Sequence, residues 1–593
     1  MKNAKHNYEK QLSKNAKSNP KLFYAYLNKK KQNRVEIGPV KNDDGCLCYK
    51  NEEMAEVMNN YYAKVFTQEN PVLPPDPPLM ECSDMDEVIC TKRKVAEILK
   101  NVKGASSPGP DEISQRILKE VADDVSYPLS LLYKKSMESG VTPVDWKCAN
   151  VIPIFKKGSK IEPSNYRPIS LTSVVVKVME RIVKERILAH LIANKLIKPS
   201  QHGFMPKKST STNLIDYLNY VTEQLDSSKP VDVLYLDFAK AFDKVPHKRL
   251  IQKLRAHKLH PKLIQWMESW LTNRKQRVMV NGVASQWTDV ISSVVQGSVL
   301  GPILFVIFIN DIDMCLRQFE GHFSKFADDT KIAKAVDNSE SALEMQTVIN
   351  YLHQWCKDWQ MEFNIDKCNF LHLGFHNQNF VYTMNGNAIS STTSQRDLGI
   401  VISDSCQPSN QCAVAAKKAN QVLGQINKSF SCYTKDIMLQ IYKVFVRPHL
   451  EHAVSAWSPW LKKDIEVMES VQRRATRRMS DVQGSYPERL NQLDLTTLEE
   501  RRKRGDAIEV YKYLHGHWNV VRESLFTIKE GPQTRHLTSY MPLVVPRARL
   551  DIRKNFFTVR ATNLWNSLPT AIRESRSVNI FKNSYDAYFS SAQ

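Results

Sequence analysis

Two adjacent aspartates, Asp328 and Asp329, constrain the fold of this chain more than any other feature of its sequence. Neighbouring carboxylates repel each other, so holding them together costs stability unless a positive charge lies between them. The β-prone residues on both sides of the pair predict a tight hairpin with the two carboxylates at its turn. A third carboxylate, Asp237, directly follows a strand predicted at 231–236, and we expect the hairpin to point toward it.

Three carboxylates held in one place predict a site for two divalent metal ions. Mg²⁺ is a hard ion that prefers carboxylate and phosphate oxygens. Two such ions, a few ångströms apart, clamp the attacking and leaving oxygens of an in-line phosphoryl transfer. For the pair Asp328 and Asp329 alone, a turn with solvated carboxylates remains an alternative.

A second pattern lies between the first aspartate and the pair. The segment 293–302 contains Gly297 and Gly301 and leads into an apolar helix predicted after Pro302. Glycine lets a backbone approach a planar ligand closely, and a helix N-terminus favours a phosphate. The alternative interpretation is a buried helix with a glycine-rich entry.

The composition favours a basic protein without structural zinc. The net charge of +21, from 83 Lys and Arg against 62 Asp and Glu, is spread along the chain and suits a protein that follows a polyanion. A merely soluble basic protein remains an alternative. The eleven cysteines form no CxxC pair, so we expect reduced thiols rather than a zinc knuckle. No secretory signal precedes residue 20, and the apolar stretch Val299–Ile309 is too short to span a bilayer, so we expect an intracellular protein without a membrane partner.

The chain of 593 residues is too long for one core and predicts two to four subdomains. Strands and helices alternate from 151 to 375, and the pattern is mostly helical and basic from about 410 to 525. Apolar periodicity predicts a helix at 174–192. A capping box at Ser341–Glu344 predicts the start of a further helix that runs through Trp359.

A set of motifs in a fixed order resembles the reverse transcriptases of non-LTR retrotransposons of the jockey-like group. These motifs are Asn165–Leu171, Gln201–Phe204, Asp237–Val245, Gln296–Pro302, Phe326–Asp329, Asn364, Lys367–Cys368, Leu371–Gly374, Arg447–Glu451, Trp457–Pro459 and Trp565–Pro569. The resemblance covers about residues 20–590.

The resemblance implies an α+β right-hand polymerase, with fingers, palm and thumb, that copies RNA into DNA. The expected domains are a helical basic extension (1–68), a Pro-rich linker (69–80), fingers and palm (81–375), a thumb-like helical region (376–490) and a basic helical C-terminal region (491–593).

The resemblance also implies the roles of individual residues. Asp237, Asp328 and Asp329 would be the metal-binding triad of the palm, with two Mg²⁺ ions, or Mn²⁺ in their place, and Phe238 would add its backbone carbonyl. Arg167 would contact the incoming triphosphate, with Lys156 and Lys157 as further candidates for the same task. Gln296 and Gly297 would lie against the nascent base pair.

Two further residues have both a functional and a structural interpretation. Phe242 lies where the resemblance places a bulky gate against the ribose 2′-hydroxyl, and the alternative is a core aromatic. Lys367 is a candidate proton donor to the pyrophosphate leaving group, and the alternative is a solvated lysine.

Two arginine clusters would contact the backbone of the template–primer duplex, which is recognised by shape and phosphates. They consist of Arg473, Arg474, Arg477, Arg478, Arg501 and Arg502. Exposed basic helix faces without a ligand are the alternative.

The implied partners are template RNA, a DNA primer or nicked target DNA, and dNTPs. Action on genomic DNA implies a location in the nucleus as well as the cytoplasm, for which Lys29–Lys31 is a short basic import run. The family usually carries an endonuclease before the polymerase, and we expect residues 1–80 to be too short for one. Two rival functions remain: an idle nucleic-acid-binding remnant, and an RNA-dependent RNA polymerase, against which Phe242 argues.

Overall fold

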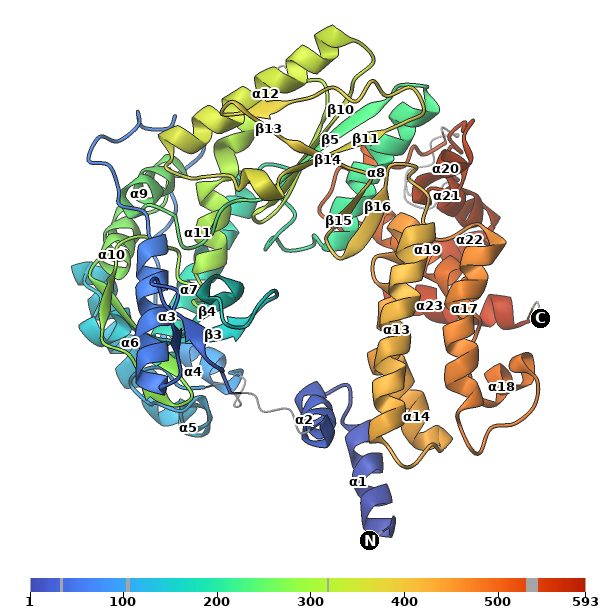
Figure 1. Cartoon of the computed structure of the whole chain (residues 1–593), viewed down its shortest axis with the longest axis horizontal. Coiled ribbons are helices and arrows are strands. Elements are labelled where there is room, and N and C mark those ends of the chain that lie inside the picture. The colour runs from blue at the N-terminus through green and yellow to red at the C-terminus, as the bar shows by residue number, and fades with distance from the viewer. Residues whose placement is uncertain (1, 32–35, 103–106, 317–318, 530–541, 592–593) are drawn as a thin grey trace.

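The computed structural model describes residues 2–31, 36–102, 107–316, 319–529 and 542–591 (Figure 1). Among the described residues, two five-stranded β-sheets, three two-stranded ones and a large group of helices make up the fold. In Figure 1 the central sheet lies at the top, the second sheet with helices α3 to α6 on the left, and the C-terminal helices on the right.

The central sheet has five strands in the order β14-β11-β5-β10-β9. They are β5 (Val231–Leu236), β9 (His322–Phe326), β10 (Asp329–Ala335), β11 (Asn369–Leu373) and β14 (Ser390–Thr392). All six residues of β5 are buried, as expected of a strand covered on both faces. Strand β5 is antiparallel to both β10 and β11, and β9 and β10 form the hairpin predicted around the aspartate pair. The predicted strand at 231–236 is also confirmed.

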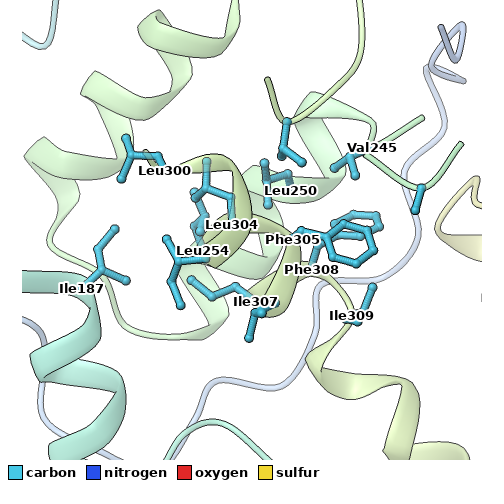
Figure 2. Close-up of a cluster of buried hydrophobic side chains, with 14 of the residues drawn as sticks. Ile187, Val245, Leu250, Leu254, Leu300, Leu304, Phe305, Ile307, Phe308 and Ile309 are labelled. Atoms are coloured by element: carbon cyan, nitrogen blue, oxygen red, sulfur yellow. The ribbon is translucent and has the colours of Figure 1, made fainter. Parts of the chain in front are cut away.

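Helices pack against the central sheet and form one continuous core. They include α7 (Val174–Ala193), α9 (His247–Ala256), α10 (Pro261–Leu271), α11 (Gly301–Phe308) and α12 (Ser339–Asp358). Helix α8 (Thr210–Asp226) covers the other face of the sheet and belongs to the core of the C-terminal helices. Helix α11 is buried on nearly all sides, since every residue from Ile303 to Phe308 is inaccessible. Figure 2 shows its Leu304 and Phe305 among Leu250 and Leu254 of α9. This helix is therefore a core element, as an all-round apolar sequence predicts.

One predicted helix start was wrong. Helix α12 begins after Asn338, whose side chain accepts a hydrogen bond from the Ser341 backbone N–H. Ser341 completes the capping box from the third helical position. The sequence motif at Ser341–Glu344 thus lies inside the first turn, because asparagine caps a helix as well as serine does.

The second sheet has the strand order β4-β3-β6-β7, with β8 also paired to β6. Its strands are β3 (Cys148–Phe155), β4 (Tyr166–Thr172), β6 (Arg274–Val280), β7 (Val283–Ala284) and β8 (Thr288–Val290). Helix α3 (Asn51–Val65) covers this sheet by packing Met54 and Met58 near Val151 and Val278. Helices α4 (Lys92–Lys100), α5 (Gln115–Glu120) and α6 (Ala122–Ser139) lie nearby.

The C-terminal half is mostly helical, as predicted, after the short hairpins β12–β13 (Thr383–Met384, Asn387–Ala388) and β15–β16 (Ser394–Asp397, Ile400–Ser403). Its helices are α13 (Ser409–Ser429), α14 (Lys435–Ile441), α15 (Pro448–Glu451), α16 (Val454–Trp457), α17 (Lys462–Arg477), α18 (Tyr486–Gln492), α19 (Leu498–Leu514), α20 (Asp551–Lys554), α21 (Phe557–Ser567), α22 (Thr570–Arg573) and α23 (Val578–Ser591). They share one hydrophobic core.

The N-terminal region does not pack as one unit. Helices α1 (Lys2–Lys14) and α2 (Pro20–Lys31) lie against α14 and α13, far along the chain. The ring of Phe23 stacks on Phe445 with 3.6 Å between centroids. Glu9 is fully buried and accepts hydrogen bonds from the backbone N–H groups of Ser431 and Cys432. Helices α1 and α2 therefore belong to the C-terminal core, whereas α3 belongs to the second sheet.

Three expected domain boundaries differ from the packing. The break at 375 falls inside the central sheet, because β14 pairs with β11. The break at 490 falls inside α18. The Pro-rich linker is fixed to α9, where the Arg249 guanidinium donates to the carbonyls of Asn70 and Val72. Among the described residues, no helix is long and apolar enough to cross a membrane.

Candidate active site

The three predicted aspartates meet at one edge of the central sheet. Leu236 of β5 pairs with Thr330 of β10, so the next residues outward, Asp237 and Asp329, face each other across the two strands. Side chains at such opposite positions have Cβ atoms about 5 Å apart. Asp328 lies beside them in the hairpin turn, where Ala327 adopts a positive φ of 58°.

The side chain of Gln201 supports the turn that carries Asp328. Its side-chain oxygen accepts hydrogen bonds from the backbone N–H groups of Ala327 at 3.0 Å and Gly203 at 2.8 Å. A Cβ atom on Gly203 would lie 2.3 Å from the Ala327 nitrogen, so only glycine permits this approach. The motif at 201–204 thus positions the aspartate turn, a role that the sequence did not reveal.

Two carboxylates of the site, Asp328 and Asp329, have a raised pKa. Burial and the nearby Asp237 carboxylate raise the pKa of Asp328. Burial, followed by the charges of Asp328, Asp397 and Asp237, raises the pKa of Asp329 to about 6, although part of its side chain remains in contact with solvent. The nearest cation is Lys367, whose Nζ lies 3.7 Å from an oxygen of Asp237. The site therefore holds an excess of negative charge that lacks a full set of cationic partners.

This donor set fits divalent cations that prefer oxygen. The carbonyl of Phe238 is also available, because Phe238 and Phe363 form a bridge in which the flanking residues make the hydrogen bonds. Within the described part of the chain, no group of three or more His, Cys, Asp or Glu residues is already gathered in a geometry that could hold a metal ion. The carboxylates are thus neighbours in the sheet edge without converging on a single point.

A pocket of about 150 Å³ opens beside the carboxylates. It is lined by Asp237 and Asp329 at the edge of the central sheet, by Lys367 from the short helix before β11 and by Asp397 from the β15–β16 hairpin. The buried Lys331 of β10 forms an ion pair with Asp397. This pair fixes the hairpin next to the aspartates.

The cations of the β3–β4 hairpin lie near the carboxylates. Arg167, at the start of β4, is exposed, and its charge lowers the pKa of Asp328 against the effect of burial. Burial lowers the pKa of Lys156, and the charges of Arg167 and Lys367 lower it further. Arg167, Lys156 and Lys367 therefore form a basic rim around Asp237, as an anionic substrate requires.

Gln296 and Gly297 lie against β4. The Gln296 carbonyl accepts a hydrogen bond from the Ser170 N–H, and a Cβ atom on Gly297 would lie 2.3 Å from the Ser170 carbonyl oxygen. The Gln296 amide donates to both carboxyl oxygens of Asp243, at 3.0 and 3.1 Å. Burial raises the pKa of Asp243 to about 6. Asp243 is a further residue of the site, which the sequence offered only as part of a motif.

Phe242 is partly exposed and packs on the core at the same time. Its ring stacks on Phe305 of α11, with 4.7 Å between centroids and 15° between planes. Phe204 meets it edge-on at 6.4 Å. The position suits both the gate and the core aromatic, since one face is covered and the other is not.

The arginines expected to bind nucleic acid lie in different environments. On α17, Arg474, Arg477 and the following Arg478 are exposed, while Arg473 pairs with Glu466. The guanidinium of Arg478 lies 5.3 Å from the Tyr433 ring. On α19, Arg501 pairs with Glu451, and Arg502 is buried, with 4% of its surface exposed. Arg502 therefore does not belong to an exposed basic face.

A mostly antiparallel sheet with carboxylates at one edge, next to a hairpin that carries cations and to a helical arm, is the arrangement of a right-hand polymerase fold. Residues 154–439 match the family model described as reverse transcriptase (RNA-dependent DNA polymerase). Over these residues the chain is similar to reverse transcriptases.

The curated relatives are proteins of mobile elements. The chain is 26% identical over 536 residues to the RNA-directed DNA polymerase from mobile element jockey of Drosophila melanogaster, which covers 84% of this chain and 56% of that protein. It is 27% identical to the jockey polymerase of Drosophila funebris, over 72% of this chain and 47% of that one. It is 25% identical to the probable polymerase from transposon BS of Drosophila melanogaster, over 69% and 47%.

The chain spans about half the length of these curated relatives. Among solved structures, apo telomerase from Candida tropicalis, truncated from its C-terminal domain, is similar with a TM-score of 0.33 and 13% identity, over 50% of this chain and 59% of that one.

Proposed function

We propose that this chain is the RNA-directed DNA polymerase of a non-LTR retrotransposon. The observation that carries the proposal is the register of β5 and β10, which sets Asp237 opposite Asp329 with Asp328 beside them. Residues 81–375, extended to include β14, would supply the fingers and palm. The residues from the end of β14 to the end of α18 would supply the thumb, and α19 to α23 a C-terminal region packed on it.

Asp237, Asp328, Asp329 and the Phe238 carbonyl would hold two Mg²⁺ ions, with Mn²⁺ as a substitute. When bound, these ions would neutralise the dNTP phosphates and lower the pKa of the primer 3′-hydroxyl. Reverse transcriptases in general use divalent metals, and the uncompensated charge of the three carboxylates supports the same use here.

The remaining residues would bind and orient the substrates. Arg167 and Lys156 would pair with the triphosphate, since such transfer depends mainly on positioning and charge stabilisation. Lys367, at 3.7 Å from Asp237, would protonate the leaving pyrophosphate. Gln296, held by Asp243, and Gly297 would support the nascent base pair, and Phe242 would exclude a ribose 2′-hydroxyl.

The proposed partners are template RNA, a DNA primer or nicked target DNA, and dNTPs, met in the nucleus and cytoplasm. The exposed arginines of α17 would contact phosphates of the duplex. The import run Lys29–Lys31 falls at the end of α2, and the side chains of Lys30 and Lys31 lie outside the described residues.

Primer extension tests the proposal directly. The protein is given poly(rA) with an oligo(dT) primer, Mg²⁺ and labelled dTTP, beside an Asp328→Asn/Asp329→Asn control. Incorporation by the native chain alone is expected. A folded native chain that binds the primed template without extending it would instead indicate an idle nucleic-acid-binding protein. Extension with UTP on the same primer, as efficient as with dTTP, would contradict the assignment as a DNA polymerase.

A further inference from the structure

A second pocket, of about 220 Å³, lies in the C-terminal helical region, away from the residues of the catalytic carboxylate site. One wall is the face of α19 that carries Arg502, Gly505 and Glu509, which are spaced three and four residues apart and so share one side of the helix, with Arg501 and Arg504 at its edges. The other walls come from the turn at Glu451–Ser455 and from Ser211 at the start of α8. The pocket therefore lies between α8 and the C-terminal helices.

Arg502 is the unusual residue of this pocket. Its side chain is 4% exposed, yet its guanidinium makes no hydrogen bond or ion pair with any residue that the structure describes, and its Nη2 atom is buried without a partner. A buried guanidinium without a partner is costly, and such charges are normally paired. Burial lowers the pKa of Arg502, against the weaker attraction of Glu469 and Glu499.

The neighbouring charges of the pocket are already neutralised. Arg501 makes a two-pronged ion pair with Glu451, and Arg504 makes one with Asp586. Glu509 accepts hydrogen bonds from Lys512 and from the Trp518 ring, at 2.7 and 2.8 Å. The charge that remains to be balanced in the pocket is therefore the positive charge of Arg502.

The pocket also offers neutral donors and free space. The hydroxyl groups of Ser211 and Ser455 make no hydrogen bond with other described residues, so both are available to a ligand. Gly505 forms an open part of the α19 wall, because a Cβ atom placed on it would meet no atom within 4 Å. A group of several oxygen atoms can thus approach Arg502 along the helix surface.

We propose that this pocket binds a phosphate group, with Arg502 as its charged anchor and the hydroxyls of Ser211 and Ser455 as additional donors. A guanidinium can donate two parallel hydrogen bonds to one phosphate, whereas a lysine ammonium acts only as a point charge. An arginine therefore suits this site better than a lysine would. The phosphate of a nucleic-acid strand and free inorganic phosphate present the same chemistry. The site is separate from the carboxylates and does not depend on polymerase activity.

The test compares Arg502→Met with Lys503→Met on the full-length chain. Both changes remove one positive charge from the same helix turn, but Lys503 is exposed and pairs only with Glu499 at the surface. Thermal unfolding is followed with EDTA present, in sodium phosphate and in sodium chloride of equal ionic strength, so that the carboxylate site cannot contribute through metal. A second arm replaces phosphate by a 5′-phosphorylated RNA tetranucleotide.

We expect phosphate to raise the melting temperature of the native chain and of Lys503→Met, and to raise that of Arg502→Met much less at the same concentration. The phosphate concentration needed for half the effect should rise about tenfold or more in Arg502→Met, the loss expected for one charge-assisted hydrogen bond. Without phosphate, Arg502→Met should melt no lower than the native chain, because it removes an unpaired buried charge.

The RNA arm identifies the source of the phosphate. A response at much lower concentration than inorganic phosphate, lost in Arg502→Met alone, assigns the pocket to a nucleic-acid strand. An equal response assigns it to the free anion. An Arg502→Met variant that responds to phosphate as the native chain does, or a native chain that responds no differently to phosphate and chloride, would overturn the proposal.

Discussion

Asp237 and Asp329 occupy opposite positions on two antiparallel strands, because Leu236 pairs with Thr330 one residue earlier. The paired strands therefore hold the two carboxylates close to each other. Burial raises the pKa of Asp329 to about 6, and the charges of Asp328, Asp397 and Asp237 raise it as well. A site that is costly without cations is one that metal binding would stabilise.

The first prediction concerns the repulsion among these carboxylates. Asp329→Asn should abolish most nucleotide incorporation, with a loss on the order of 10²–10³-fold as for removal of one charge-stabilising group. The same change should raise the melting temperature in EDTA, because it removes a carboxylate that its neighbours oppose. Mg²⁺ should raise the melting temperature of the native chain more than that of the variant.

Thermal unfolding with and without Mg²⁺ checks the expected melting temperatures, and a single-turnover extension assay checks the expected loss of incorporation. Asp366→Asn, a carboxylate one residue before Lys367 that is not part of the triad, serves as the control and should behave as the native chain does. Equal Mg²⁺ effects on the native chain and on Asp329→Asn would contradict a metal role for Asp329.

The second prediction concerns the support of the aspartate turn. Gln201→Ala removes the acceptor of two buried N–H groups, those of Ala327 and Gly203. The expected cost is about 1–3 kcal/mol of unfolding free energy for a buried donor left without a partner. Activity should fall further than stability alone explains, since Asp328 loses its fixed position.

Urea unfolding and the extension rate at a temperature where all variants stay folded measure these effects. Gly203→Ala should have the same consequence, because its Cβ would collide with the Ala327 backbone. Gly424→Ala on α13, where a Cβ meets nothing within 4 Å, is the matched control and should be neutral or slightly stabilising. A fully active Gly203→Ala would refute this role of the turn.

The third prediction concerns pH. Burial raises the pKa of Asp243 from 3.8 to about 6, so the folded protein binds this proton more tightly than the unfolded chain does. Its contribution to stability is complete below pH 3.8 and is lost as the pH rises through about 6, a change of about 3 kcal/mol. Asp243→Asn should remove this part of the pH dependence.

Unfolding free energies of the native chain and Asp243→Asn at several pH values between 3.5 and 7 provide the comparison. The variant should gain stability relative to the native chain as the pH rises, provided that Gln296 turns its amide to offer an oxygen to the new side chain. A difference in unfolding free energy that stays constant across this pH range would show that the pKa of Asp243 is not raised in the folded protein.

The fourth prediction concerns Phe242. If its open face meets the ribose, Phe242→Val should reduce the preference for dTTP over UTP at least tenfold, while extension with dTTP continues. Phe305→Leu, which alters the buried ring beneath Phe242, should lower stability and leave this preference unchanged. Competition between the two nucleotides on one primer measures the ratio. An unchanged ratio in Phe242→Val would leave the ring as a core residue only.

Local patterns in the sequence determined much of this protein. The strand before Asp237, the hairpin around Asp328, the long helix α7 and the helical C-terminal half are all present as expected. Each depends on residues within a few positions of one another, where alternation, apolar periodicity and turn chemistry act directly. The order of the sequence motifs also indicated the resemblance to reverse transcriptases, because each motif can be read directly from a short stretch of sequence.

Contacts between distant segments were decided only by the tertiary structure. Gln201 meets Ala327, and buried Asp232 accepts hydrogen bonds from His372 and Tyr382, at 2.7 and 2.6 Å. Helices α1 and α2 lie on α14 and α13, and Arg502 lies inside a pocket rather than on a basic face. No local pattern encodes these pairings, because they result from how whole elements pack to bury their apolar faces, and that packing brings together residues that the sequence keeps hundreds of positions apart.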